Sequence, residues 1–460
     1  MRRIFDFFHI DDIPALARPN YIAELKQMSL WGFLVGAVEG NMAGVVASKT
    51  FNASPLLTSI IWALPILINV LNPVWSNIIR GRPRARMFVI LVSGASLGTL
   101  SVGLTSTEWK SWAALIFALQ IGFTHLFLSG LITLRTAMWK VNYPQAQRAS
   151  IAGRLQKLRI LLSLLTSVAL GALFNKNPEL YRFVYPTMAI LGLLSLWPIR
   201  RLRMRGEPTE LRRFQAHLAR NNGNENGRIT LWQGLKESAA ILRDDRPYAR
   251  YMLAQFLLGS ANFFTDPLLL IMLTKELEFS YSSSILLLFQ VPTVLLLVSI
   301  RYWAKLFDRI GVLRFRIYNS ACWAGAYLGV VISMAIIGLG GAELLPLALI
   351  VLTLSRVLNG LGRGGGAIAW NLGHLHFARE HQTELYMGIH VGLTGIRGLT
   401  MPLLAWAVSQ YLLWASFGLP LLSATVAHIM FRRMAAADQQ PSRECAPDRE
   451  EPSGPRPDIT

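Results

Sequence analysis

The sequence predicts an all-α polytopic membrane protein with twelve transmembrane helices, arranged as two pseudo-symmetric bundles of six. Composition is the first observation, because 53% of the 460 residues are hydrophobic and only 15% are charged. The mean hydropathy of +0.39 is the second. The third is a series of apolar runs, each close to the roughly 20 residues that a helix needs to cross a bilayer. Together these observations exclude an ordinary soluble protein of this length.

Charged residues bound the apolar runs and therefore define the expected spans. The spans lie near residues 29–48, 56–78, 87–105, 112–138, 158–174, 183–199, 250–273, 284–303, 317–339, 345–372, 386–410 and 412–431. The expected organisation is a cytoplasmic N-terminal segment (1–25), a first bundle (26–199), a cytoplasmic central loop (200–249), a second bundle (250–431) and a disordered cytoplasmic tail (432–460). Within the central loop, apolar residues that share one face predict a short helix at 230–242.

Basic residues alternate between the loops, as expected for a membrane protein whose cytoplasmic loops carry more Lys and Arg. The loops predicted to face outward hold few of them, namely Lys49, Lys110, Lys176, Arg182 and Lys275. This pattern predicts a multi-pass protein of the inner (plasma) membrane with both termini in the cytoplasm. Orientation and anionic lipid account for the net charge of +19. Nucleic-acid binding is not expected, because no basic patch interleaved with stacking aromatic residues lies outside the spans.

A short basic turn joins the eighth and ninth predicted spans. It reads Ala304-x-Leu306-x-Asp308-Arg309-x-Gly311-x-x-Arg314. Gly311 suits a tight reversal of the backbone, and Asp308 can accept from exposed amides or pair with a cation. The turn resembles the loop signature of the major facilitator superfamily, which implies a cytoplasmic latch that differs between conformations. The alternative is an ordinary basic loop with a turn glycine. In the equivalent loop of the first half, Gly81 and the arginines are present, but Ile78 stands where the acid would be.

A second motif, Arg356-x-x-Asn359-Gly360-x-Gly362-x-Gly364, lies in the tenth span. It resembles the fourth-helix signature of the same superfamily, in which an Arg is followed by a polar residue and spaced glycines. The fourth span itself has Phe117 in the place of that Arg. The resemblance implies two six-helix halves that rock about a central site and expose it alternately to each side of the membrane.

Polar side chains inside the spans are candidates for a substrate or proton pathway, because ionisable groups are costly at membrane depth. In the seventh span the polar residues recur on one helix face at i, i+7 and i+11. In the first span Glu39 lies among spaced glycines that favour close helix packing. The alternative is that these groups only pair with one another and hold the bundle together. The candidates are Glu39, Gln255, Asn262, Asp266, Arg356, Asn359, Arg363, His390 and Arg397. Arg135, near the inner end of the fourth span, is expected to extend to the membrane surface.

Metal and cofactor sites are not expected. The two cysteines, Cys322 and Cys445, are too few for a disulfide framework or a thiolate site. His374 and His376 are two residues apart and would point away from each other on a helix. No constellation of nucleophile, base and orienting group predicts an enzyme.

The preferred interpretation is a secondary active transporter that moves a small solute by alternating access. The arginines outnumber the buried acids, which favours an anionic solute, and H+ is a candidate coupling ion through Glu39 or Asp266. Expected partners are the solute and the lipid bilayer, and the protein is expected to act as a monomer. The alternatives are an efflux pump for amphipathic drugs or metabolites with the same fold, and a non-transporting membrane scaffold or sensor.

Overall fold

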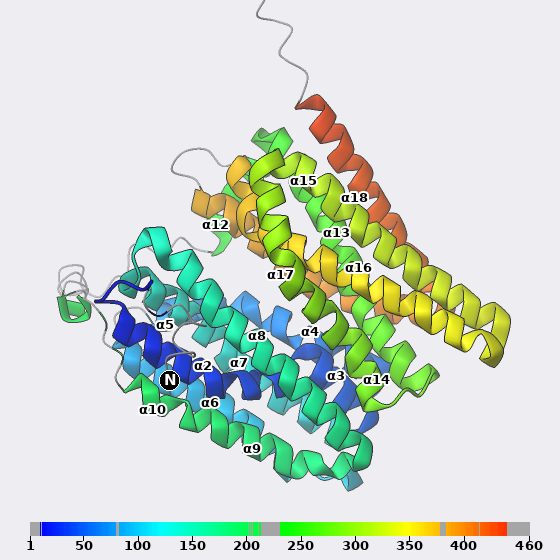
Figure 1. Ribbon diagram of the computed structural model, residues 1–460, viewed down its shortest axis with the longest axis horizontal. Helices are drawn as coiled ribbons and strands as arrows, with labels where there is room; N and C mark the ends of the chain where they lie inside the picture. The colour runs from blue at the N-terminus through cyan, green and yellow to red at the C-terminus, as the bar shows by residue number, and fades with distance from the viewer. Residues whose placement is uncertain are drawn as a thin grey trace, which may run out of the picture.

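Helices make up the described part of the chain, and no strand is present there. The computed structural model describes residues 10, 12–79, 82–200, 202, 204, 206–209, 211–212, 231–377, 383–413 and 415–438. The predicted tail beyond residue 438, residues 213–230 of the predicted central loop and the pair Arg80 and Gly81 lie outside this range. Figure 1 shows α2 to α10 on one side of the molecule and α13 to α18 on the other.

The described residues of the first half form nine labelled α-helices. They are α2 (Arg18–Val38), α3 (Gly40–Lys49), α4 (Pro55–Leu67), α5 (Asn72–Ile79), α6 (Arg84–Ser101), α7 (Ser111–Asn142), α8 (Gln145–Lys176), α9 (Tyr181–Leu194) and α10 (Leu196–Ile199). A proline in the first turn favours the start of α2 and of α4, because its missing N–H has no helical partner there. Ser54 also caps α4 by accepting a hydrogen bond from the Leu57 amide.

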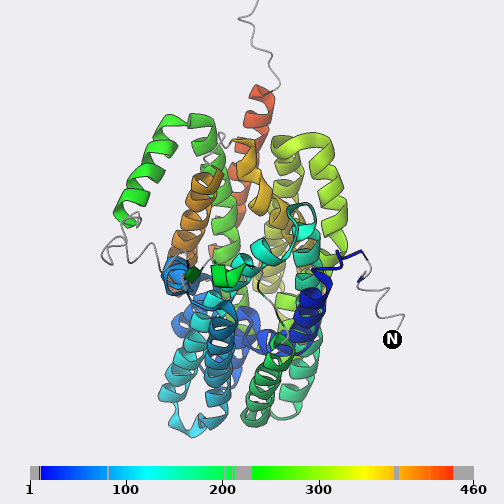
Figure 2. The ribbon, with the colours of Figure 1, turned by 90° about the vertical axis from the view of Figure 1, so that its left-hand side faces the viewer.

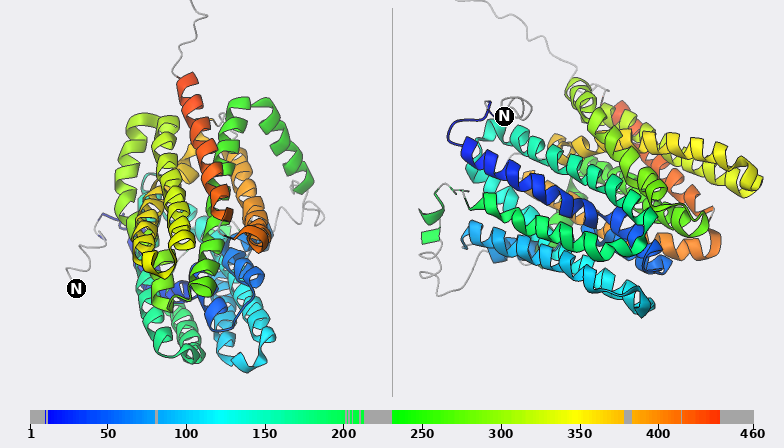
Figure 3. Two further views of the ribbon diagram at one scale, coloured as in Figure 1. Left: turned by 90° about the vertical axis from the view of Figure 1, so that its right-hand side faces the viewer. Right: turned by 60° about the horizontal axis from the view of Figure 1, so that its bottom comes forward.

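The second half is built from longer helices. They are α12 (Leu231–Asp244), α13 (Arg246–Ile271), α14 (Tyr281–Ile285), α15 (Val291–Gly340), α16 (Leu345–Leu372), α17 (Thr383–Leu412) and α18 (Gly418–Ala437). Two π-helical turns, Met272–Glu276 and Leu286–Gln290, follow α13 and α14. Helix α12 confirms the short helix predicted in the central loop. Figure 2 and Figure 3 show the helices of each half running alongside one another.

Among the described residues, eight helices are long and apolar enough to cross a membrane, and α2 with α3 makes a ninth span if this pair, bent by 43°, is counted as one. The multi-pass membrane architecture is therefore confirmed, whereas the count of twelve stays a prediction. One reason for the lower count is that Tyr281–Gly340 is a single run of 60 residues. The sequence had assigned this run to two spans and a turn.

Gly311 divides α15 into two arms at the predicted turn. Its φ of 72° and ψ of 170° are non-helical. Residues with a Cβ rarely adopt this combination, so glycine is what allows the chain to reverse here. The predicted role of Gly311 in a backbone reversal is confirmed.

Hydrogen bonds between the two halves gather at one end of the bundle. Ser48 and Thr274 lie 2.7 Å apart through their hydroxyl oxygens. The hydroxyl groups of Thr50 and Tyr281 are 2.9 Å apart. In the same region, the Asn175 amide donates to the Ser282 hydroxyl at 2.8 Å. These residues lie in or beside the loops predicted to face outward, so the halves are held together at that end.

Candidate functional site

The first span is broken at Glu39, which separates α2 from α3 with φ −54° and ψ 140°. The break removes helical partners from the last carbonyls of α2. His125 of α7 supplies one replacement, with its Nε2 2.9 Å from the Val38 carbonyl. A carbonyl only accepts, so this ring nitrogen carries the proton. The Tyr185 hydroxyl of α9 donates to the Ala37 carbonyl at 3.4 Å. The sequence predicted a single span at 29–48, and the structure adds a break within that span at Glu39.

Glycines allow the broken span to sit tightly among its neighbours. A Cβ on Gly40 would lie 2.6 Å from the Trp62 carbonyl oxygen of α4. A Cβ on Gly44 would lie 2.5 Å from the Leu270 side chain of α13. Gly36 is equally close to α8. The predicted close packing around these glycines is confirmed, and it brings Glu39 to the boundary between the halves.

A cavity of about 390 Å³ lies at this boundary. The first half contributes Glu39, Asn41 and Trp62, among others. Helices α13, α15 and α16 of the second half contribute polar and aromatic side chains, including Asn262, Asp266, Trp323, Arg363 and Trp370. Four of the predicted candidates, Glu39, Asn262, Asp266 and Arg363, therefore line one cavity.

Asp266 is the buried acid of this cavity, with 1% of its surface exposed. Its Oδ1 accepts from the Arg356 Nη2 at 3.3 Å, and its Oδ2 accepts from the Arg363 Nη2. Arg356 is also 1% exposed, and its Nε donates to the Leu287 carbonyl at 2.9 Å. That carbonyl belongs to the π-helical turn Leu286–Gln290, where the ordinary helical bonding pattern is altered. Arg356 therefore stands behind the cavity, joining Asp266 to the π-turn.

Arg363 forms an ion pair with Asp266 and also acts on Glu39 through its charge. It is half-buried, faces the cavity, and its Nε has no hydrogen-bond partner in the described part of the chain. Its charge acts on Glu39 as well as on Asp266, and the charge of Arg159 in α8 also acts on Glu39. Because a guanidinium presents donors on several edges, Arg363 can hold Asp266 and still offer a donor to a solute.

The other predicted candidates lie outside this lining. Arg397 donates from Nη1 to the Gln255 carbonyl at 2.7 Å and from Nη2 to the Thr394 hydroxyl at 2.7 Å. The His390 ring packs edge-on against Trp370, with 5.4 Å between the ring centroids, so it stands behind the cavity wall. Asn359 is buried, and its Oδ1 has no partner among the described residues. A role for these residues in the pathway stays a prediction.

Three residues of the loop motif are exposed, namely Asp308, Arg309 and Arg314. Within the described residues, Asp308 makes no ion pair. A latch would need Asp308 to form a contact that differs between conformations, so the latch that the motif implies stays a prediction.

Arg135 is buried, contrary to the expectation that it extends to the membrane surface. It is 6% exposed, donates to the Gln27 Oε1 at 2.6 Å, and lies over the Phe88 ring. Helix α7 continues to Asn142, so Arg135 stands two turns before the helix end. The sequence reasoning misjudged where the helix ends.

Arg316 and His125 were not singled out from the sequence. Arg316 lies two residues beyond the basic turn, and it is 1% exposed because the second arm of α15 begins just after Gly311. His125 lies inside the fourth predicted span, where an ionisable residue is itself a signal of function or pairing. The presence of an ionisable residue inside a predicted span could therefore have identified His125 as a candidate.

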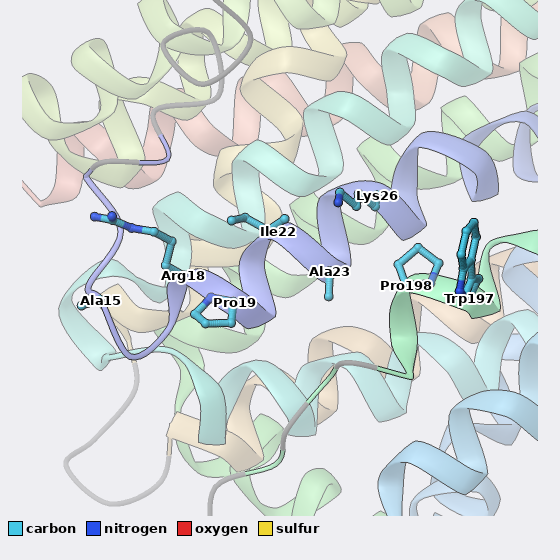
Figure 4. Close-up of a pocket in the computed structure, with 8 residues that line it drawn as sticks. All are labelled: Ala15, Arg18, Pro19, Ile22, Ala23, Lys26, Trp197 and Pro198. Carbon is cyan, nitrogen blue, oxygen red and sulfur yellow. The ribbon is translucent and has the colours of Figure 1, made fainter. Parts of the chain in front are cut away.

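A second cavity, of about 460 Å³, lies on the outside of the first half between α2 and α10 (Figure 4). Ile22, Ala23, Trp197 and Pro198 give it a mainly apolar wall. It touches neither the polar stripes nor the boundary between the halves, so the smaller cavity is the candidate site. Within the described residues, no group of three or more His, Cys, Asp or Glu side chains could hold a metal ion.

Comparison with known proteins finds similarity in structure alone. No protein-family model matches the sequence, and no curated protein matches it. A bacterial homologue of the iron transporter ferroportin in an inward-facing state is 16% identical, with a TM-score of 0.61, covering 92% of this chain and 98% of that chain. The inward-open xylose transporter XylE from E. coli is 14% identical, with a TM-score of 0.60, over 91% and 98% of the two chains.

A transporter of the POT family, solved with 5-aminolevulinic acid, is 11% identical with a TM-score of 0.64, covering 93% of this chain and 98% of that chain. These neighbours are all transporters, and each is matched along almost its whole length. With 91–93% of this chain covered, the agreement extends over the helices of both halves. The chain therefore has the fold of the major facilitator superfamily.

Proposed function

We propose that this protein is a secondary active transporter that carries a small anionic solute by alternating access and couples it to H+. The proposal rests on the polar cavity between the halves and on the charges that line it. The observation that carries it is the position of Arg363, which pairs with Asp266 and faces the cavity beside Glu39.

The charges around Asp266 do not cancel. Arg356 and Arg363 contribute two positive charges and Asp266 one negative charge, which leaves one positive charge at the cavity wall. Ionised Glu39 offsets this positive charge, and Arg159 also acts on Glu39. When Glu39 takes up a proton, the positive charge becomes available to the carboxylate of a solute. Proton and anion therefore favour each other's binding, as coupled transport of both in the same direction requires.

The aromatic walls indicate what else the solute carries. Trp62, Phe263, Trp323 and Trp370 line the cavity beside the charged groups. Aromatic faces bind the apolar part of a ligand while the polar groups fix its orientation. This lining also supports the second candidate, an efflux pump for amphipathic compounds, in which the aromatic contacts would dominate.

Uptake into proteoliposomes tests the proposal. A panel of carboxylates, neutral sugars and amphipathic cations is offered with and without a pH gradient. Glu39→Gln should retain carboxylate binding but lose the drive from the pH gradient, because it mimics the protonated acid. Arg363→Lys should weaken carboxylate affinity roughly tenfold or more, since a hydrogen bond to a charged group contributes about 1.5–3 kcal/mol.

Arg433→Lys is the matched control, because Arg433 is exposed and lies outside both the cavity lining and the loop motif. Its carboxylate kinetics should equal those of the unmodified protein. Transport of cations alone would favour the efflux pump. Transport of neutral solutes only, or a Glu39→Gln variant that still responds to the pH gradient, would contradict the anion-proton proposal.

A further inference from the structure

A second cluster of cationic and polar side chains lies in the second half, outside the lining of the central cavity. Arg316 comes from the second arm of α15, and Arg397 and His390 come from α17. Tyr251 of α13 and His374 of the short turn Gly373–His376 complete it. The two arginines are only 1% and 3% exposed, and His390 is 2% exposed.

Gln255 of α13 holds both arginines of this cluster. The Arg316 Nη2 donates to its side-chain oxygen, and the Arg397 Nη1 donates to its backbone carbonyl at 2.7 Å. Two guanidinium groups therefore meet on one uncharged residue. The charges of both also act on the His390 ring.

No carboxylate pairs with either arginine within the residues that the structure describes. Arg356 and Arg363, by contrast, share Asp266. Buried cations are normally paired, because burial of an uncompensated charge is costly. The two guanidinium groups also repel each other in a region that water screens poorly. The cluster therefore has a site for negative charge that the protein does not fill in the described residues.

Unpartnered polar atoms in the cluster add a second, independent observation. One atom on each of its five members is buried without a hydrogen-bond partner in the described residues. Both arginine Nε atoms and the Tyr251 hydroxyl are donors, and each imidazole nitrogen becomes one in the appropriate tautomer. The atoms are Tyr251 Oη, Arg316 Nε, His374 Nδ1, His390 Nε2 and Arg397 Nε.

We propose that this cluster binds a small monovalent anion, which serves as the counter-ion of Arg316 and Arg397. Small size follows from the tight packing around the donors. The Arg397 Nη1 lies against Gly259 and the Tyr251 hydroxyl lies against Gly373, so closely that a Cβ on either glycine would clash. The anion joins α13, α15 and α17, and it is separate from the solute of the central cavity.

Thermal unfolding of the full-length purified protein in detergent tests this site. Chloride, bromide or nitrate replaces gluconate at constant ionic strength, and formate, sulfate and phosphate form further arms. The small monovalent anions should raise the unfolding temperature saturably, because a ligand that binds only the folded state stabilises it by mass action. Formate is itself a small monovalent anion, so its effect should match that of chloride or nitrate, whereas a response to sulfate or phosphate alone would overturn the proposal.

Arg316→Gln and Arg397→Gln should each abolish the saturable response. In gluconate they should unfold at the same temperature as the unmodified protein or higher, because one of two repelling charges has been removed. If the arginines had only a structural role, the two variants would instead unfold at a lower temperature in every salt. Arg309→Gln, at an exposed position, and Arg363→Gln, in the central cavity, should keep the response.

The proposal is overturned if the unmodified protein shows no saturable response to small anions. It is also overturned if Arg363→Gln abolishes the response while Arg397→Gln retains it, because the anion then sits in the central cavity. If neither arginine variant folds, chloride-35 line broadening on the unmodified protein, competed by nitrate, decides the matter. Thermal unfolding and chloride-35 line broadening do not depend on transport, so failure of this proposal can be distinguished from failure of the proposed transport function.

Discussion

At the scale of single residues, the buried Asp266 is held by two arginines that differ in exposure. Arg356 is buried and fully engaged with Asp266 and backbone carbonyls, whereas Arg363 reaches the cavity. One acid therefore binds both an arginine buried within the second half and an arginine that lines the cavity. The bundle-holding role and the proposed pathway role, which the sequence presented as alternatives, both involve this carboxylate.

Arg356→Gln should destabilise the folded protein by about 3–5 kcal/mol, because removal of one partner leaves other buried polar groups without compensation. The expected readout is a lower unfolding temperature in detergent. Arg309→Gln removes an exposed arginine and should change the free energy of unfolding little. An Arg356→Gln protein as stable as the Arg309→Gln protein would show that the Asp266 pair contributes little to packing.

At the scale of elements, the break between α2 and α3 is stabilised from outside the span. His125→Leu should leave the Val38 carbonyl unsatisfied in a buried position, at a cost of about 1–3 kcal/mol of stability. Tyr185→Phe should cost less, because its bond to the Ala37 carbonyl is long, at 3.4 Å. Thermal unfolding of both variants tests this order. Equal stability of the two variants would mean that another group satisfies Val38.

The reversal within α15 depends on one backbone conformation. Gly311→Ala should cost about 1–3 kcal/mol, because alanine is strained at φ 72° and ψ 170°. The space around Gly311 is open, so side-chain clashes do not contribute. Gly392→Ala in α17 is the matched control, since its surroundings are also open and its backbone is helical. Equal unfolding temperatures for the two variants would rule out backbone strain at Gly311.

At the scale of the whole molecule, hydrogen bonds hold the halves together at the end formed by Ser48, Thr274 and their neighbours. Alternating access requires this end to open. In a background without native cysteines, Ser48→Cys with Thr274→Cys should form a disulfide that stops transport, and reduction should restore it. Ser29→Cys with Thr425→Cys, at positions far from this contact in sequence, is the unlinked control. Full transport after confirmed cross-linking would exclude opening at this end.

Asp308→Asn tests the latch implied by the loop motif. Loss of the charge should shift the balance between conformations and lower turnover, while the unfolding temperature stays unchanged because Asp308 is exposed. Labelling of single cysteines on the two membrane faces measures that balance. Unchanged labelling together with full transport would show that the motif acts only as a connection between helices.

The sequence by itself determined the helical membrane architecture, because apolar runs of spanning length have few other ways to satisfy their backbone groups. It also determined the reversal at Gly311, which is a local backbone property. Only the tertiary structure decided which polar stripe reaches the cavity. Asp266 and Gln255 lie on the same helix, yet Asp266 lines the cavity while Gln255 holds Arg316 and Arg397. That difference depends on which helices pack against each turn, and helix periodicity carries no information about those partners.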